Sequence, residues 1–519
     1  TPYGTVRATN GGFMRYNPAR HQLERVAQLS IPNPWGIAFD DWGQNIFAET
    51  SGPEIRWILP STIKPRYGQG NDKAPSMLNE HEKVRPTSGL EFVSSRHFPD
   101  EIQGDLLINN SIGFLGMRQY KISQNKTGFH LDLRHDLVEG SDQNFRPVDM
   151  EFAPDGSLYF IDWHNVLIGH MQHNARDPLR DHVHGRVYRI TYPSRPLVKP
   201  AKVVDAPIST LLENLKLPEY RTRYRTRREL RNRNPKEVLT ALITWVGNLD
   251  KKNDRYEHHK LEALWVTWGL NKINENILLQ LLDAKDFRAR AAAVQVLRYS
   301  GHQIKNQPKL LLKAASDENS RVRLEAITAA TWLDSTKGLE ILKEAGKYPL
   351  DKWMKPTHTR AIAHLEGRNL EIKKAEIQTH LRGADRELFI KGKELYEREA
   401  YCGTCHQEQG QGLASAGYPP LRQSKWVREN EDRLIKLTLK GIYGPMTVLN
   451  RDYKGLVPMT PFEGLMNDEE IAAVLTFVRN RFGNRGSVIY PKKVEEVRAK
   501  IAKKDGFYTA KELLKLHPH

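Results

Sequence analysis

The sequence predicts a chain of several domains: a β-rich N-terminal part, a helical repeat in the middle, and a small all-α domain near the C-terminus. Three observations predict this order. Similar strand-and-turn units recur in the first 200 residues, and the spacing of apolar residues changes to about 3.6 near residue 207. The segment Cys402–His406, Cys-Gly-Thr-Cys-His, follows the helical part. A chain of 519 residues is long enough for several such domains.

Residues 1–200 are predicted to form strands joined by turns, because short apolar runs end in signals such as Asp40-Asp41-Trp42-Gly43. Three similar units begin at Asn33, Arg85 and Arg146, each followed by proline. A repeat of strands every 50 to 60 residues or so is typical of β-propeller blades. About three blades do not close a ring of the usual four to eight. We therefore expect the remaining blades to be missing from this chain or to come from a second chain.

These units resemble the propellers of the soluble glucose/sorbosone quinoprotein dehydrogenases. The motifs at Asn33–Phe39, Gly104–Ile108 and Asn144–Asp149 follow that family's order and correspond to the second half of its ring. The resemblance implies a site for pyrroloquinoline quinone, with calcium, that includes Asn33 and Arg146. The family's other quinone-binding cations have no counterpart here. Each missing cation leaves a quinone carboxylate less well paired.

A dense set of polar side chains follows the third unit, between residues 162 and 186. Imidazoles and carboxylates gathered in one loop can bind a sugar or a metal ion and can include a general base near neutral pH. His170 and His184 are the candidate catalytic residues, with Asp162 as the group that orients them. The alternative is a loop that ion pairs hold over the propeller.

Residues 207–380 are predicted to form paired helices. The segments His259–Trp265, Arg288–Leu297 and Arg321–Ala330 align without gaps and carry apolar residues at helical spacing. Helix pairs of this size resemble a short HEAT-type solenoid. We expect it to act as a docking surface and as a spacer between the propeller and the C-terminal domain. The basic cluster Arg221–Arg233 is expected to be a solvated helix face or a clamp between domains.

The segment Cys402–His406 predicts covalent attachment of haem. Two thiols two residues apart form thioether bonds to the vinyl groups of haem c, and His406 then becomes a ligand of the iron. A zinc site would need two more ligands, and Cys402 and Cys405 are the only cysteines of the chain. A redox-active dithiol would not need the histidine.

The residues around this segment, 386–484, predict a small cytochrome. Gly392 lies on an apolar helical stripe, where a second helix can approach closely. Asn467 and the acidic residues after it predict the start of another helix, which ends at Gly483. The stretch resembles the class I c-type cytochromes. The lysine-rich residues 485–519 are predicted to form a basic C-terminal tail.

The second axial ligand of the iron is predicted to be Met459. A methionine thioether stabilises reduced iron and raises the reduction potential. Met459 lies in a loop that Pro458 and Pro461 stiffen, which favours a fixed ligand over the rivals Met446 and Met466.

The order of propeller, HEAT-like repeats and single-haem cytochrome resembles a family of exported bacterial proteins described as membrane-bound dehydrogenases with a haem-binding CxxCH domain. The resemblance implies oxidation of a sugar-like alcohol or aldehyde in the propeller. Electrons would pass through the haem to an external acceptor, a cytochrome or an oxidase. The alternative is a non-catalytic electron-transfer protein, or a scaffold whose degenerate propeller binds glycan or protein.

Charge and composition bound the partners and the location. The net charge is +17, from 79 Lys and Arg against 62 Asp and Glu, which favours acidic partners. No zinc-finger or RNA-recognition signature is present, so we expect no nucleic-acid partner. No apolar run is long enough to span a membrane. Bacteria attach haem to thiols outside the reducing cytoplasm, so we expect a periplasmic or exported protein. The first residues do not resemble a signal peptide.

Overall fold

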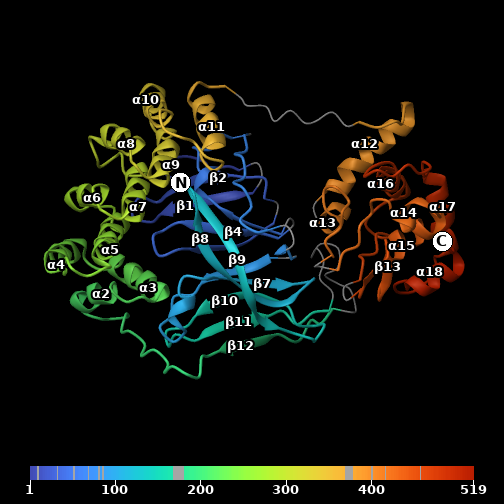
Figure 1. Cartoon of the computed structure of the whole chain (residues 1–519), viewed down its shortest axis with the longest axis horizontal. Helices are drawn as coiled ribbons and strands as arrows, with labels where there is room; N and C mark the ends of the chain where they lie inside the picture. The colour runs from blue at the N-terminus through green and yellow to red at the C-terminus, as the bar shows by residue number, and fades with distance from the viewer. Residues whose placement is uncertain are drawn as a thin grey trace.

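The computed structural model describes the chain except for residues 9–10, 32, 51–52, 68, 80–81, 85–86, 167–179, 369–377, 399–400, 415–416 and 456–457. Three parts follow one another (Figure 1): β-sheets in blue and cyan, helices in green and yellow, and a smaller, mostly helical domain in orange and red. None of the helices in the described ranges combines the length and apolar character that a membrane span requires.

The N-terminal part contains a two-stranded hairpin and three antiparallel sheets, in which strands adjacent in sequence pair. Each repeated unit supplies the first strand of one sheet: β3 (Pro34–Phe39), β6 (Thr87–Phe92) and β10 (Pro147–Phe152). Strand β6 contacts both β3 and β10, so the three first strands lie in a row. The remaining elements are β1 (Gly12–Asn17), β2 (Gln22–Gln28), β4 (Asn45–Glu49), β5 (Glu54–Trp57), η1 (Leu59–Ser61), η3 (Asp100–Ile102), β7 (Leu106–Ser111), β8 (Leu115–Asn125), β9 (Gly128–Glu139), β11 (Leu158–Asp162) and β12 (Arg186–Ile190).

The sheets at the two ends of this row leave apolar side chains uncovered. Trp35, Ile37 and Phe39 alternate along β3 and are each more than a third exposed. On the third sheet, Ile161 pairs with Val187, and both are exposed. The predicted β-rich part is therefore present, but the described residues form no closed ring of sheets.

The middle part consists of paired helices, and the three aligned segments lie in α5, α7 and α9. Equivalent N-caps explain where two of them begin: Asp286 caps α7 and Asn319 caps α9, each through its side chain. The helices are α2 (Ile208–Asn214), α3 (Tyr220–Arg231), α4 (Pro235–Gly247), α5 (Tyr256–Gly269), α6 (Glu275–Leu282), α7 (Phe287–Arg298), α8 (Gln307–Ala315), α9 (Ser320–Ala330), α10 (Ser335–Ala345) and α11 (Lys355–Leu365).

The solenoid and the first two sheets share one hydrophobic core. Trp353, just before α11, packs edge-on against Trp57 of β5, with ring centroids 5.9 Å apart. Its ring also covers Gly128, where an added Cβ would lie 2.4 Å from the indole. The expectation of a spacer is therefore wrong, because the helices pack along the β-rich part instead of separating it from the C-terminal domain.

The basic cluster on α3 is a clamp between the solenoid and the sheets. Arg221 binds Glu91 of β6 at 2.5 Å, and Arg225 binds Glu151 of β10 at 2.7 Å. Arg223 is fully buried and pairs with Glu262 of α5 at 2.8 Å. These three arginines thus join α3 to three other elements, as expected of a clamp between domains.

The C-terminal domain has a separate core. Helices α12 and α16 cross at Gly392, where an added Cβ would lie 2.0 Å from the carbonyl oxygen of Ala473, and the capping box of Asn467 and Glu470 begins α16. Both features were predicted. The elements are α12 (Gly383–Glu397), α13 (Cys402–His406), α14 (Lys425–Arg428), α15 (Glu431–Lys440), β13 (Met446–Val448), β14 (Arg451–Tyr453), α16 (Asp468–Asn480), α17 (Pro491–Lys500) and α18 (Ala510–Leu516).

Residues 485–519 belong to this core. The side chains of Val494, Val497 and Leu513 are fully buried in it. Arg498 of α17 also binds Asp468 at the start of α16 at 2.7 Å. The segment expected as a basic tail is therefore a helical layer of the C-terminal domain.

Candidate functional site

Helix α13 holds Cys402, Cys405 and His406 in one short turn. Gly403 lets this turn approach α12 closely, since an added Cβ would lie 2.7 Å from the carbonyl oxygen of Tyr396. The two cysteines are half-buried, and neither is in a disulfide. Burial raises the pKa of the Cys402 thiol to about 12.

The imidazole of His406 is buried and fixed. Its Nδ1 lies 2.8 Å from the carbonyl oxygen of Pro419. A carbonyl only accepts, so Nδ1 carries the proton and Nε2 keeps the lone pair that iron needs. Burial lowers the pKa of His406, which favours the neutral ring at pH 7. Two thiols and a neutral, oriented imidazole fit covalently bound haem.

Met459 lies in the same domain, packed against its core together with Cys402. Its backbone N–H donates to Ile442 at 2.9 Å, and its carbonyl lies 2.3 Å from the Cβ that a larger residue would have at Gly441. Of the rivals, Met466 is buried in the core and Met446 lies on β13. Met459 as the second axial ligand stays a prediction.

Arg146 has a structural role at the start of β10. It is almost fully buried. Its guanidinium nitrogens donate to the carbonyl oxygens of Ser111, Asn165 and Val166 at 2.7 to 3.0 Å. Burial lowers its pKa to about 10, although Tyr418 and two carboxylates oppose that shift. A guanidinium held in this way does not fit the role of pairing with a quinone carboxylate.

The other residue carried over from the quinoprotein dehydrogenases, Asn33, lies at the matching end of β3. Its carbonyl oxygen accepts the N–H of Thr50 at 3.1 Å. The structure shows no bond from Asn33 to Arg146 among the described residues, so quinone binding gains no support from these two positions.

Asp162 holds the loop between β11 and β12. Its carboxylate accepts the backbone N–H groups of Arg146 at 2.6 Å and His164 at 2.9 Å, and the Nε of Arg186 at 2.5 Å. Asp162 therefore orients the backbone of the loop. It does not orient the ring of His184, as predicted, because that ring pairs with a different carboxylate. His170 lies outside the described residues.

The partner of His184 is Asp181, whose Oδ2 lies 2.8 Å from His184 Nδ1 and 3.4 Å from His164 Nε2. Backbone N–H groups lower the pKa of Asp181 strongly, and His184 adds to this shift. His164 and Asp181 were not among the predicted catalytic residues. Asp181 and His184 are three residues apart, so the sequence alone could have indicated that they pair. His164 comes close to them only through the pairing of β11 with β12, which the sequence does not show.

The C-terminal domain contacts this end of the third sheet. The Tyr443 hydroxyl donates to Oε1 of Gln143 at 3.1 Å. Tyr418, next to the Pro419 that fixes His406, lies close enough to Arg146 for its phenol to favour the charged guanidinium. The loop that fixes His406 therefore also approaches the β-rich part.

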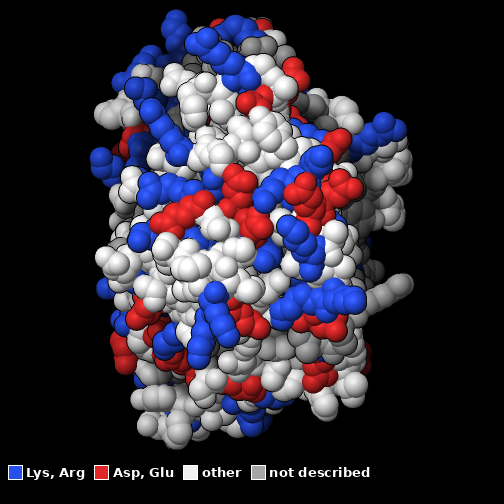
Figure 2. Space-filling model, turned by 90° about the vertical axis from the view of Figure 1, so that its right-hand side faces the viewer, with Lys and Arg blue, Asp and Glu red and all other residues white. Residues whose placement is uncertain are grey.

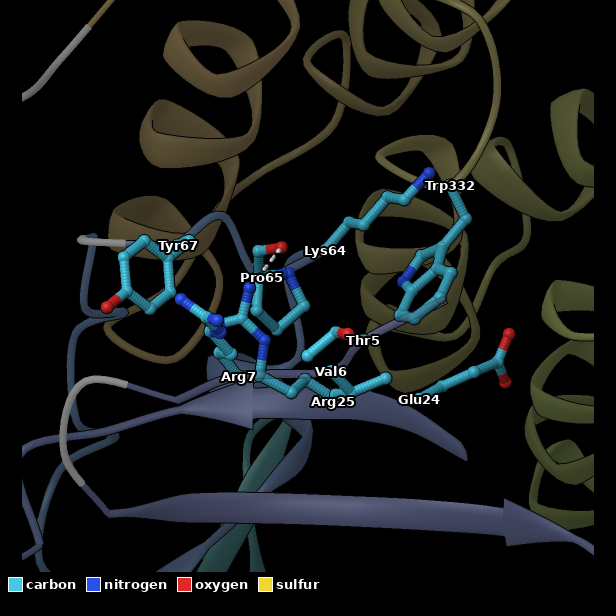
Figure 3. A pocket seen from close by; sticks show the side chains of 9 residues that line it. All are labelled: Thr5, Val6, Arg7, Glu24, Arg25, Lys64, Pro65, Tyr67 and Trp332. Carbon is cyan, nitrogen blue, oxygen red and sulfur yellow. Dashed lines mark hydrogen bonds between the residues drawn. The ribbon is translucent and has the colours of Figure 1, made fainter. Parts of the chain in front are cut away.

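A separate pocket of about 420 Å³ lies between the N-terminal hairpin and the solenoid (Figure 3). Trp332 and Tyr67 line it together with Lys64, and Lys64 lies 5.7 Å from the centroid of the Trp332 ring. The predicted site residues are not among those that line this pocket.

The fold and the Cys-x-x-Cys-His site together define a c-type cytochrome: a domain that binds haem c covalently and transfers electrons, joined to a helical repeat and a β-rich part. Residues 389–481 match the cytochrome c family, and residues 275–362 match HEAT repeats. Residues 2–194 match a domain of unknown function (DUF7133).

Two curated relatives are cytochromes c-552, both from Thermus thermophilus and the second from one particular strain of that species. Each is 36% identical over 121 residues, which are 22% of this chain and 86% and 76% of the relatives. The chain therefore belongs to the cytochrome c family through its C-terminal domain. The predictions of haem c and of HEAT-like repeats are confirmed.

Proposed function

We propose that this cytochrome couples oxidation of a sugar-like alcohol or aldehyde in the β-rich part to reduction of an external acceptor. One observation supports the proposal: Tyr443 of the C-terminal domain donates to Gln143 at the end of the third sheet, and the loop that fixes His406 lies near Arg146 on the same side. A substrate site at the polar loop of the third sheet would lie beside the haem domain, which favours electron transfer between them.

The polar loop offers the groups that such a reaction needs. His184, paired with Asp181, is positioned as a general base. In that loop the amide oxygen of Asn165 has no hydrogen-bond partner among the described residues, and neither have the buried amide of Asn109 and the hydroxyl of Ser111 on β7 of the neighbouring sheet. Buried polar atoms of this kind are usually satisfied by water or a ligand.

The number of electrons released by the oxidation determines how they must pass from the β-rich part to the haem. Oxidising one alcohol group to a carbonyl releases two protons and two electrons. Haem c exchanges one electron at a time. The β-rich part would therefore need a two-electron centre, a quinone or another redox group, that delivers the electrons in two steps to the acceptor through the haem.

The acceptor, a cytochrome or an oxidase, would bind the C-terminal domain. On the face shown in Figure 2, Lys and Arg side chains alternate with Asp and Glu, so the net charge is not gathered into one basic patch there. An acceptor docking on this face would meet charges of both signs. Covalent haem attachment supports a periplasmic or exported location.

The exposed apolar faces of the first and third sheets support a partial propeller. In a closed ring each blade packs against two neighbours, and these faces have the alternating apolar residues of such contacts. A second chain that supplies the remaining blades would cover Trp35, Ile37 and Phe39 at one end and Ile161 and Val187 at the other.

A non-catalytic electron-transfer protein or scaffold is the second candidate. The hydrogen bonds of Arg146 favour this candidate, because its guanidinium already donates to backbone carbonyl oxygens and is not available to pair with a quinone carboxylate. In that case the β-rich part would bind glycan or protein, and the haem would only relay electrons.

One experiment separates the two functions. The purified haem-loaded chain is mixed with a panel of sugars, with and without pyrroloquinoline quinone and calcium, and the absorption band of the reduced haem is followed. We expect reduction by a subset of the sugars, at a rate that His184→Gln lowers and His182→Gln does not. If dithionite alone reduces the haem, the dehydrogenase proposal is wrong and the second candidate stands.

A further inference from the structure

Three side chains of the loop between β11 and β12 converge on one point. His164, Asp181 and His184 each offer one ligand atom, and these atoms all lie within 4.8 Å of one another. Ligands held about 2.1 Å from a tetrahedral ion lie about 3.4 Å apart. The distance of 3.4 Å between His164 Nε2 and Asp181 Oδ2 has this value, and the 2.8 Å between Asp181 Oδ2 and His184 Nδ1 would lengthen to it when an ion replaces the proton they share.

The backbone holds the three residues in place. Asp181 uses Oδ1 to accept the N–H groups of Val183 at 2.8 Å and His184 at 2.9 Å, so that Oδ2 faces the two imidazoles. Asn165 donates to the carbonyl oxygen of Asp181 at 3.0 Å and ties the two halves of the loop together. The ligand atoms therefore do not depend on flexible side chains alone.

The ring of His164 is not bonded like that of a structural histidine. Its Nδ1 is buried and has no hydrogen-bond partner among the described residues. Its backbone has a positive φ of 53°, a conformation that histidine, asparagine and aspartate adopt more often than other non-glycine residues. The other ring nitrogen, Nε2, faces Asp181, so it is the atom that an ion at this point would bind.

We propose that His164, Asp181 and His184 bind one divalent transition-metal ion of the zinc and iron(II) class. Two imidazoles and one carboxylate suit these ions, whereas calcium and magnesium prefer oxygen ligands alone. The His184 side chain is 69% exposed, so one side of the site faces solvent. Three protein ligands with an open side leave positions for water or a substrate oxygen, as in catalytic metal sites.

This inference goes beyond the proposed function and does not depend on it, but it changes one role: with an ion bound, His184 and Asp181 would hold the metal, and a water on the metal would serve as the base in place of His184. An ion at this site would polarise a bound oxygen, whether the loop oxidises a substrate or only binds one. Its position beside Asp162 and Arg186 places it at the same end of the sheet that meets the haem domain.

The test is metal content per haem in the full, haem-loaded chain. The protein is treated with a chelator, dialysed against micromolar Zn²⁺ and washed, and zinc and iron are counted by mass spectrometry; covalently bound haem supplies one iron as the internal standard. We expect one zinc per haem, with X-ray absorption that shows two imidazole nitrogens and one oxygen near 2.1 Å.

The variants are chosen to remove a ligand atom while keeping the backbone hydrogen bonds and conformation of the loop. Asp181→Asn retains the oxygen that accepts the two N–H groups and should weaken zinc binding at least tenfold. His164→Asn tolerates the positive φ and should abolish stoichiometric binding. His182→Ala, exposed and adjacent, should bind zinc like the unaltered chain. The proposal is overturned if the unaltered chain binds no stoichiometric zinc, or if the two ligand variants bind as well as His182→Ala. The zinc test uses no substrate. A failure to bind zinc would therefore not contradict the dehydrogenase proposal, which the haem-reduction experiment tests separately.

Discussion

Replacing Met459 by alanine is expected to lower the reduction potential of the haem. If Met459 is the second axial ligand, its thioether stabilises the reduced iron, and water or an empty position would take its place. We expect a fall on the order of 100 mV or more, within the range that axial ligands span. An optical redox titration of the full chain measures it.

Met466→Leu is the control for this prediction, because Met466 is buried in the core of the same domain and leucine conserves its bulk. It should leave the potential nearly unchanged. If Met466→Leu lowers the potential and Met459→Ala does not, Met459 is not the ligand.

Single residues differ in how far the sequence predicts their roles. Cys402, Cys405 and His406 act through local spacing, so their chemistry could be predicted. The approach of His164 to Asp181 depends on the pairing of β11 with β12 and could not. Arg146 was predicted by resemblance, but its burial against backbone carbonyls is visible only in the structure.

Among the elements, the crossing of α12 and α16 depends on Gly392. Gly392→Ala places a methyl group against the carbonyl of Ala473 and should destabilise the domain by about 1 to 3 kcal/mol. Denaturant unfolding followed by haem absorption measures this loss. Glu394→Ala, exposed on the same helix, is expected to stay within about 0.5 kcal/mol of the unaltered chain. Equal stability of the two variants would contradict the close crossing.

The clamp between α3 and β6 should make stability depend on pH. Burial raises the pKa of Glu91 to about 7, and Arg221 opposes this without offsetting it. The folded state therefore holds a proton more tightly than the unfolded state, whose carboxyl has a pKa near 4.5. The stability that this proton provides is present below about pH 4.5 and is lost as the pH rises to about 7.

Glu91→Gln removes this titration and keeps an acceptor for Arg221. The unfolding free energy of the unaltered chain, relative to the variant, should fall by about 1 kcal/mol or more between pH 5 and pH 8. Denaturant unfolding at a series of pH values checks the sign. Parallel pH profiles of the two proteins would show that Glu91 does not titrate in this range.

The helices of the solenoid and of the cytochrome could be predicted because their apolar residues repeat at helical spacing. Helices α17 and α18 could not. Their many lysines suggested a solvated tail, whereas a few apolar positions, Val494, Val497 and Leu513, decide where they pack.

For the whole molecule, the core of the cytochrome is separate from the core that the solenoid shares with the sheets, and the two smaller clusters lie within the β-rich part. We therefore expect two unfolding transitions, one for the solenoid with the sheets and one for the cytochrome. Arg298 and Glu325 form a buried pair that joins α7 to α9. Glu325→Gln leaves the arginine charge uncompensated and should lower the stability of the first unit by about 3 kcal/mol. Haem absorption reports the cytochrome alone, so the part of the circular dichroism change that does not coincide with it reports the first unit.

Lys313→Ala is the matched control, because Lys313 and Asp283 form an exposed pair on the same solenoid. It should change stability by less than about 1 kcal/mol. A shift of the haem-monitored transition in Glu325→Gln would contradict the separation of the two units.

The position of Tyr418, near enough to Arg146 to act on its charge, has a practical consequence. The loop that fixes His406 through Pro419 also carries Tyr418, so a ligand that binds beside Arg146 is expected to change the surroundings of that imidazole. The absorption spectrum of the haem would then report binding at the polar loop, because a small spectral shift would indicate a bound ligand without an added label.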